Sequence, residues 1–285
     1  ESAMIRKFSF IIFLLLVSLG VFLFLKSPGQ QSTYQSFDGS IFGTRYQVQY
    51  RKHPQLSLDA EAIKQLVEKG LQGIDQIAST WKPDSEISRY NRAVSKDGFQ
   101  LSDELREIMT LSEQLKVSTG GAFDIHHQGE EIDVSAIAKG YAVDRIADYL
   151  HDDLDIQDFL VEIGGEVKAR GNNAKAKPWK VAIYIPPSHA HIVGPRVTLN
   201  NTSIATSGLY FKENHIKNAE TGHAPDHDLL SCSVIHPSNA TADALATALY
   251  VMGAEAGLAW ANENEVKAIF IKNDGTVLES TKFRR

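Results

Sequence analysis

Several features that would narrow the function of a chain are scarce or missing here. Among 285 residues there is a single cysteine, Cys232, so no disulfide can form within the chain. There is no excess of positive charge either: the formal net charge is -6, which leaves no basic stripe to neutralise a phosphodiester backbone. Repeats and low-complexity segments are absent outside one apolar run. These absences argue against a nucleic-acid-binding protein and leave ordinary globular material, 43% hydrophobic, with a real core.

The apolar run lies at residues 8–25, behind Arg6 and Lys7. It is long for the apolar part of a signal peptide and just long enough to span a bilayer as a helix. Neither a small-residue cleavage motif nor a cysteine follows it, so we expect an uncleaved anchor; the alternative is a cleaved signal segment. The basic flank should stay in the cytoplasm, which places the rest of the chain on the outer side.

Composition divides the chain into four segments. Residues 1–7 hold an expression remnant before Met4 and the cytoplasmic flank, and residues 8–25 form the anchor or signal segment. Residues 26–36 are rich in Gln, Ser and Gly and are expected to be a tether. Residues 37–285 are expected to form one folded domain.

Hydrophobic periodicity in the folded domain predicts strands and helices in irregular order. Helices are expected at 58–78 behind Ser57 as N-cap, from Ser102 onward, and from Gly140 to Leu150. Strands are expected at 46–50, at 159–163, after the turn Gly164-Gly165 through Ala169, at 179–185, and at 267–271 followed by a hairpin turn at Asn273-Asp274-Gly275. Cys232 lies in the apolar run 229–235, where a buried strand residue is expected; the alternative is a reactive thiol. This order predicts an α+β sandwich of mixed sheet and helices.

The segment 241–247 predicts the start of a helix, with Thr241 as N-cap. Asp243 and Thr247 are four residues apart, so they share one helix face and can present a carboxylate and a hydroxyl to the same point. Oxygen donors of this kind suit Mg²⁺. The alternative is that Asp243 only complements the helix dipole and Thr247 bonds to its own backbone.

Small residues between Asp133 and Lys139 join a strand end to a helix start, which lets backbone amides approach an anion. Lys139 could supply the local positive charge that the composition as a whole lacks; the alternative is a solvated surface lysine. His215 precedes Thr221-Gly222, and a histidine is a natural base for taking a proton from a hydroxyl. A lone histidine is more often structural, and the chain has ten.

In combination, these segments resemble the ApbE family of flavin transferases, which move FMN from FAD onto a protein threonine. The resemblance covers nearly everything after the N-terminal segment. It is carried, in chain order, by Phe42-Gly43-Thr44, by 81–91, by Gly120-Gly121-Ala122-Phe123-Asp124, by 132–144, by Ile204-Ala205-Thr206-Ser207-Gly208, by 215–222 and by 241–247. The chain has a shorter loop after Gly-Ala-Phe-Asp than the family usually has.

The resemblance implies a fold, a reaction and a set of site residues. The fold is an α+β, T-fold-like sandwich of the ApbE type behind one N-terminal transmembrane helix. A threonine hydroxyl attacks the FMN phosphorus of FAD and AMP leaves, while Mg²⁺ neutralises the developing charge. The implied site comprises His215 as catalytic base, the FAD contacts Phe42, Trp81, Ala122, Phe123, Asp124, Asp133, Lys139 and Lys217, and the Mg²⁺ ligands Ala136 (backbone carbonyl), Asp243 and Thr247. Core packing is the alternative for Phe42 and Trp81.

The expected partners follow from the resemblance. They are FAD as substrate, an acceptor protein with a target threonine that belongs to a membrane redox complex, and the bacterial inner membrane through the anchor. The expected location has the N-terminus in the cytoplasm and the catalytic domain in the periplasm. Two alternatives stay open: hydrolysis of FAD to FMN and AMP, in which water replaces threonine, and a non-catalytic FAD-binding or assembly protein.

Overall fold

The computed structural model describes residues 34–283 except 127–130, 210–215 and 220. The expected anchor and His215 therefore lie outside the described residues. The strands are β1 (Tyr34–Ile41), β2 (Thr44–Arg51), β3 (Phe159–Ile163), β4 (Glu166–Arg170), β5 (Trp179–Ala182), β6 (Arg196–Leu199), β7 (Thr202–Ser207), β8 (Leu229–His236), β9 (Lys267–Lys272) and β10 (Val277–Glu279). The helices are α2 (Ala60–Ala78), α3 (Glu86–Arg92), α4 (Asp103–Ser118), α5 (Ser135–Asp148) and α6 (Asn239–Glu263), with a π-helical turn at Tyr149–Asp153 and a 3₁₀ turn at Pro187–His189.

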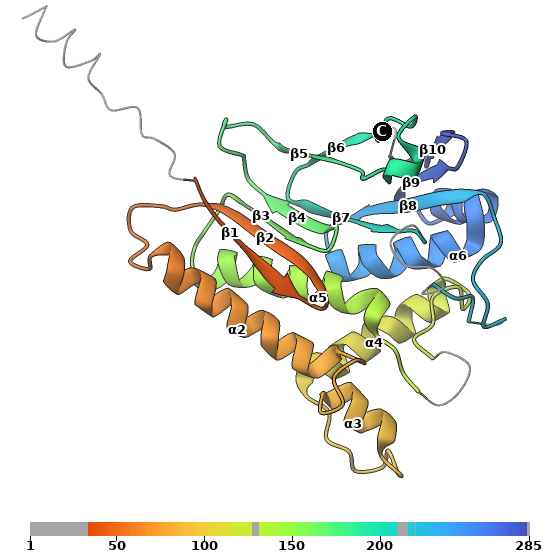
Figure 1. Cartoon of the computed structure of the whole chain (residues 1–285), viewed down its shortest axis with the longest axis horizontal. Coiled ribbons are helices and arrows are strands. Elements are labelled where there is room, and N and C mark those ends of the chain that lie inside the picture. Colours follow the sequence, from red (N-terminus) through yellow and green to blue (C-terminus); the bar gives the residue numbers. More distant parts are fainter. Residues whose placement is uncertain (1–33, 127–130, 210–215, 220, 284–285) are drawn as a thin grey trace, which may run out of the picture. The chain divides into compact units, whose positions relative to one another are not determined.

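One large sheet organises the described chain. Eight strands run in the order β1-β2-β3-β4-β7-β8-β9-β10, and every described pair is antiparallel. Helices α2, α4, α5 and α6 lie on one face, while the separate β5–β6 hairpin covers the other (Figure 1). The α+β sandwich that the sequence predicts is confirmed.

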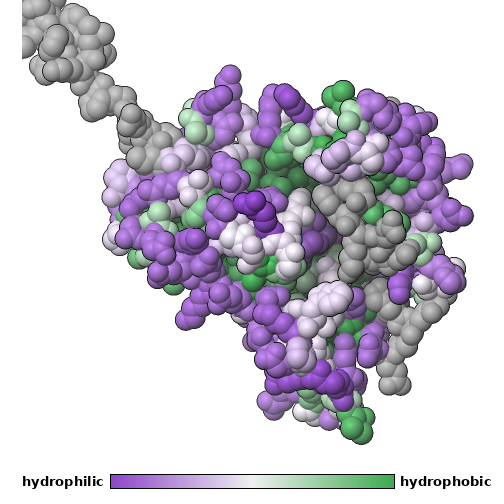
Figure 2. Space-filling view, in the orientation of Figure 1, coloured by the Kyte–Doolittle hydropathy of each residue, from purple (hydrophilic) through white to green (hydrophobic). Residues whose placement is uncertain are grey.

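Two hydrophobic cores follow from this layering. The larger core lies between the sheet and the helices, and the apolar face of α2 contributes Ile63, Val67 and Leu71 to it. The smaller core lies under the β5–β6 hairpin and includes Trp179. Hydrophilic side chains dominate the described surface in Figure 2, with apolar side chains showing mainly in its middle. Both faces of the central strands are thus buried, and a buried charge there requires a partner.

The predicted strands are found, but two predicted helix caps are wrong. Helix α2 begins two residues later than expected, because Asp59 Oδ1 accepts from the Ala62 amide (2.8 Å) and takes the place of Ser57 as N-cap. Helix α6 begins at Asn239, because Ser238 Oγ accepts from the Thr241 amide (3.2 Å); Thr241 lies inside the first turn. A carboxylate or hydroxyl three residues before a free amide decides where each helix starts.

Two further outcomes concern β1 and β8. Residues 34–36, assigned to the tether from composition, belong to β1, because the whole of β1 pairs with β2 from Tyr34 opposite Arg51 to Ile41 opposite Thr44. Cys232 is buried in β8, where burial raises the pKa of its thiol, so the expected structural role is confirmed and a reactive thiol is excluded.

Helix α6 is long and apolar enough to cross a membrane, but most of it is buried in this fold. It breaks at Gly253, whose φ of 80° is not helical. At the break, His227 Nε2 lies 2.6 Å from the Tyr250 carbonyl, while His227 Nδ1 accepts from the Leu229 amide. The His227 imidazole thus links the Tyr250 carbonyl of α6, near the break, to the first residue of β8.

Helices α5 and α6 come into direct backbone contact at Gly140. A Cβ atom at this position would lie 2.5 Å from the Asn239 carbonyl oxygen and 2.8 Å from Ala240 Cα. Backbone on the α6 side cannot rotate away as a long side chain would. Glycine is therefore required here because of the close approach, and the approach brings the start of α6 beside the middle of α5.

Replacing Gly140 with Ala should destabilise the protein by about 1–3 kcal/mol, because the added methyl overpacks two backbone segments. The matched control is Gly73→Ala in α2, where nothing lies within 4 Å of the new carbon; there the free energy of unfolding should rise by about 0.5–1 kcal/mol through helix propensity. Urea denaturation followed by circular dichroism measures both. Equal effects at the two glycines would contradict the close contact.

Candidate active site

Three charged side chains from three elements meet beside the α5–α6 contact. Lys139 Nζ, from α5, lies 3.5 Å from Glu166 Oε2 of β4 and 3.5 Å from Asp243 Oδ2 of α6. The two carboxylates are almost fully buried, with 3% and 4% of their side chains exposed, whereas 28% of the Lys139 side chain is exposed. We call these three residues the charged cluster. The cluster brings together two residues of the predicted site, Lys139 and Asp243, with Glu166, which was not predicted.

Local geometry explains how Glu166 reaches the cluster. Strands β3 and β4 are joined by the two-residue turn Gly164-Gly165, in which both residues have positive φ (62° and 104°). Such φ values are costly for residues with a side chain, so the glycines allow the tightest hairpin and make Glu166 the first residue of β4. Since Glu166 pairs with Ile163, it shares the buried helix-facing side of the sheet.

Electrostatics hold the charged cluster together. Burial lowers the pKa of Lys139, but Asp243 and Glu166 raise this pKa by more, so the ammonium stays charged. Burial raises the pKa of Asp243, opposed by Lys139 and by the Gly140 amide. Burial also raises the pKa of Glu166, while Lys139 lowers this pKa and Asp243 adds to the rise. A solvated surface lysine, the alternative for Lys139, is excluded by these contacts.

The predicted Mg²⁺ ligands adjoin this cluster. Asp243 Oδ2 accepts from the Gly140 amide (3.0 Å), so Asp243 serves α5 and does not merely complement the dipole of its own helix. Ala136 lies in the first turn of α5, one turn before Gly140. Thr247 lies one turn beyond Asp243, with its Oγ1 3.0 Å from Ser207 Oγ of β7. The side-chain atoms that could bind a metal ion here are oxygens, the Asp243 carboxylate and the Thr247 hydroxyl.

Asp133 lies at the entrance to α5. Its Oδ1 accepts from the Ser135 amide (2.9 Å), which turns the chain into the helix. The neighbouring Ile132 is held by Asn91 of α3: the Asn91 carboxamide donates to the Ile132 carbonyl (2.8 Å) and accepts from the Ile132 amide (2.9 Å). Asn91 thereby fixes the segment before Asp133 as a pairing strand would.

The Ala122-Phe123-Asp124 segment makes mainly internal contacts. Phe123 is 2% exposed in the larger core, and Ala122 packs against the same core. Asp124 binds Lys116 Nζ (2.8 Å) and His126 Nδ1 (3.0 Å). Burial raises the pKa of Asp124, but the hydrogen bonds from Lys116 and His126 outweigh it and leave the pKa below its usual value. An FAD contact for these three residues stays a prediction.

The remaining predicted residues lie on loops. Phe42 is half-buried in the β1–β2 turn with a φ of 51°, an uncommon conformation for a residue other than glycine. Trp81 follows α2 and is 80% exposed, which excludes core packing as its role. Lys217 is exposed, and the following turn is closed by the Gly222 amide on the Asn218 carbonyl (2.8 Å). Contact of these side chains with FAD stays a prediction.

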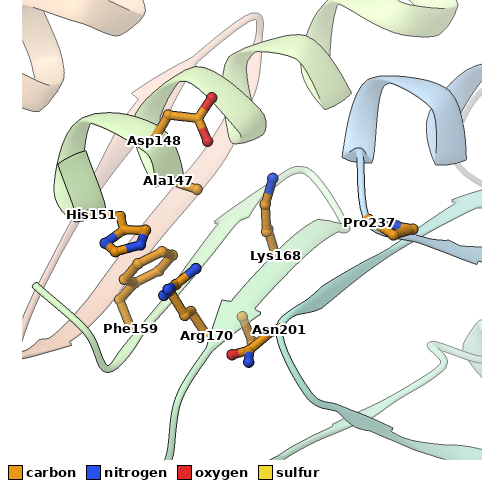
Figure 3. Close-up of a pocket in the computed structure, with 9 residues that line it drawn as sticks. Ala147, Asp148, His151, Phe159, Lys168, Arg170, Asn201 and Pro237 are labelled. Atoms are coloured by element: carbon orange, nitrogen blue, oxygen red, sulfur yellow. The ribbon is translucent and has the colours of Figure 1, made fainter.

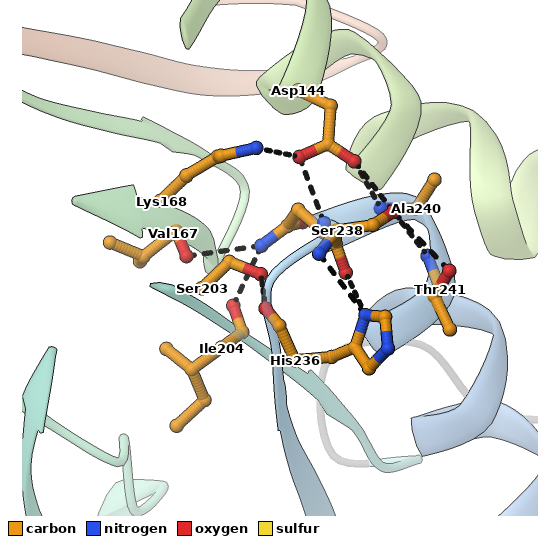
Figure 4. A network of polar contacts seen from close by, with 10 residues as sticks. Asp144, Val167, Lys168, Ser203, Ile204, His236, Ser238, Ala240 and Thr241 are labelled. Carbon is orange, nitrogen blue, oxygen red and sulfur yellow. Dashed lines mark hydrogen bonds and ion pairs between the residues drawn. The ribbon is translucent and has the colours of Figure 1, made fainter. Parts of the chain in front are cut away.

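A residue outside the predicted set, Asp144, fixes the start of α6 (Figure 4). Its carboxylate accepts from Lys168 Nζ (2.7 Å), Ser238 Oγ (2.9 Å) and the amides of Asn239 (2.9 Å) and Ala240 (3.0 Å). The first turn of a helix has free amides, and a carboxylate from α5 satisfies two of them here. Asp144 thus holds the helix that carries Asp243 and Thr247.

Asn239 anchors the same turn to the sheet. Its buried amide nitrogen donates to the carbonyls of Val167 (3.0 Å) and Ile204 (3.1 Å), one on β4 and one on β7. Lys168, the cationic partner of Asp144, also lines a cavity of about 180 Å³ with His151, Arg170 and Asn201 (Figure 3). None of the sequence-predicted site residues lines this cavity.

Comparison with known proteins identifies the family and covers the residues of the charged cluster. A family model described as "ApbE family" matches residues 42–129 and 125–270. The chain belongs to the ApbE family. The matched ranges contain Lys139, Glu166 and Asp243, so the charged cluster lies within the part of the chain that family members share.

Individual relatives and solved structures agree with ApbE membership. Proteins named "FAD:protein FMN transferase" are 27% identical in Haemophilus influenzae (93% of this chain, 95% of the relative) and 29% identical in Vibrio cholerae (90% and 92%). The solved ApbE flavin transferase of Vibrio cholerae aligns with a TM-score of 0.81 at 28% identity, over 88% of this chain and 98% of that chain. The apo flavinyl transferase ApbE of Pseudomonas stutzeri aligns with a TM-score of 0.80 at 29% identity, over 88% and 95%. The ApbE fold is thereby shown.

Replacing Asp144 with Asn should destabilise the protein by about 2–4 kcal/mol, because the carboxamide has one acceptor oxygen for four donors and leaves Lys168 partly buried without an anion. The matched control is Asp38→Asn, which removes an exposed pair with Arg45 and should cost less than about 1 kcal/mol. Thermal and urea unfolding of both variants measure the difference. A small effect at Asp144 would show that α6 does not depend on this cap.

Proposed function

We propose that this chain transfers FMN from FAD to a threonine hydroxyl of an acceptor protein and releases AMP. The observation that carries the proposal is the charged cluster, which joins Lys139 and Asp243, both assigned from family resemblance to binding of FAD and metal. The named activity of the relatives in Haemophilus influenzae and Vibrio cholerae supports the same reaction. Their matched regions cover most of this chain.

Mg²⁺ is the metal that the donor atoms favour. Among the described residues no three His, Cys, Asp or Glu side chains gather as a metal site. What the structure offers is one buried carboxylate, Asp243, with the Thr247 hydroxyl one turn away on α6, and Ala136 one turn before Gly140, the residue of α5 whose amide Asp243 accepts from. Mg²⁺ is commonly held by one or two carboxylates together with waters and substrate phosphates, so these residues fit it.

Different residues of the chain carry out different parts of the proposed reaction: charge neutralisation and proton acceptance. A bound Mg²⁺ would neutralise charge on the pyrophosphate of FAD. Lys139 adds a fixed positive charge at the edge of the cluster, where part of its side chain is exposed. The threonine oxygen forms a bond to the FMN phosphorus as the bond to the AMP oxygen breaks, and His215 accepts the threonine proton.

The partners and location are part of the proposal. A span at residues 8–25 would hold the domain at the outer face of a bacterial inner membrane, beside membrane redox proteins that carry flavin on threonine. The experiment that tests the function incubates the full chain with FAD, Mg²⁺ and an acceptor bearing a target threonine. Covalent flavin and AMP are expected together; FMN and AMP without covalent flavin would indicate hydrolysis, and bound but unchanged FAD would indicate a non-catalytic protein.

Replacing Asp243 with Asn should reduce transfer by at least about 10³-fold, because the change removes the one anionic metal ligand while keeping the side-chain volume. Asp228→Asn is the control: it removes an exposed aspartate paired with Lys272 and should leave transfer unchanged. Covalent flavin is measured across a range of Mg²⁺ concentrations. Full activity of Asp243→Asn at limiting Mg²⁺ would exclude Asp243 as a ligand.

Replacing His215 with Ala should lower the transfer rate at neutral pH by about 10²–10⁴ and leave FAD affinity within a small factor, because a general base acts mainly in the transition state. Single-turnover rates and FAD titration separate the two quantities. A parallel loss of binding and rate would make His215 a ligand contact, and no change in either would remove it from the mechanism.

A further inference from the structure

Glu166 is the member of the charged cluster to which neither the sequence patterns nor the proposed reaction gives a role. It is almost fully buried, and its Oε2 makes no hydrogen bond with any residue that the structure describes. The nearest cation to that oxygen is Lys139 Nζ, at 3.5 Å, outside good hydrogen-bond geometry. Burying a carboxylate oxygen without a hydrogen bond lowers the free energy of unfolding, so the position of Glu166 calls for an explanation.

The balance of charges in the cluster explains why Glu166 is kept there. The cluster holds one cation and two carboxylates, and Lys139 lies at the same distance from both. If Asp243 takes a divalent cation as its partner, the ammonium and the metal carry like charges around a single carboxylate, and they repel each other. A second buried anion beside Lys139 compensates that repulsion.

We infer that Glu166 is a positioning residue that takes over Lys139 when Asp243 binds a metal ion, so that ammonium and metal can occupy the site together. The inference rests on the proposed function in that Asp243 is taken as a metal ligand. Lys139 would move from a position shared between two carboxylates to full pairing with Glu166, whose free Oε2 can accept the hydrogen bond.

Direct metal binding tests the inference without relying on turnover. Mn²⁺ is titrated into the full chain without flavin and followed by electron paramagnetic resonance, for the unaltered protein and for four variants: Glu166→Gln, Lys139→Met, the two combined, and Asp243→Asn. Glu166→Gln should weaken Mn²⁺ binding about tenfold, because the repulsion from Lys139 is no longer compensated. Lys139→Met should tighten binding, and the double variant should return to within about threefold of the unaltered protein.

The control for loss of a carboxylate is Glu162→Gln on β3, which pairs with Val167 and lies on the opposite face of the hairpin from Glu166. It should leave Mn²⁺ affinity unchanged. Mn²⁺ affinity of Glu166→Gln within twofold of the unaltered protein, or no restoration in the double variant, would overturn the inference. If Glu166→Gln does not fold, Lys139→Met decides alone, since its affinity has to rise.

Asp243→Asn separates this inference from the proposed function. Loss of Mn²⁺ binding in Asp243→Asn with unchanged binding in Glu166→Gln would overturn only the role of Glu166. Unchanged binding in Asp243→Asn, or no binding by the unaltered protein, would remove the metal assignment on which both depend.

Discussion

At Gly140 the backbone of α5 touches the first turn of α6, and the charged groups of the site depend on that contact. The contact places Asp243 where it can accept from the Gly140 amide, and one turn further along α5 it places Asp144 at the free amides of α6. Helix α5 therefore supplies the Gly140 amide to the Asp243 carboxylate of α6. It also supplies the Asp144 carboxylate to the first-turn amides of α6. Steric fit and electrostatics fix the same arrangement.

The buried charges are tolerable only because they are shared. Three ionisable groups lie together in the charged cluster, and the Asp144–Lys168 pair lies one turn away along α5. Isolated burial of any of these charges would cost several kcal/mol. Pairing across α5, β4 and α6 offsets that cost and makes the relative positions of the three elements mutually dependent.

Local patterns in the sequence were sufficient to predict most of the helices and strands. Alternation located β2 and β5, and Asn273-Asp274-Gly275 located the hairpin between β9 and β10. The pattern could not choose between neighbouring capping residues, so Ser57 and Thr241 were expected where Asp59 and Ser238 act. β1 was not predicted, and its first three residues were assigned to the tether, because polar residues resemble a tether until they are paired with β2.

The site, like the fold, contains residues that the sequence predicted and residues that only the structure identifies. Lys139 and Asp243 were predicted from motifs read along the chain and from the family resemblance, and the structure places their charged groups 3.5 Å apart. Glu166 and Asp144 were not, because what distinguishes them is contact with residues far away in sequence: Asp144 meets its α6 partners across 94 to 96 positions. No local spacing encodes such a contact.

That separation has a consequence for the order of events in folding. The end of a helix ordinarily frays first, since its amides have no partners within the helix. At α6 the first-turn amides of Asn239 and Ala240 are held by Asp144, and Asn239 is also tied to β4 and β7. This end is therefore assembled late, after α5 and the middle of the sheet exist, and its amides exchange with solvent only when the whole domain opens.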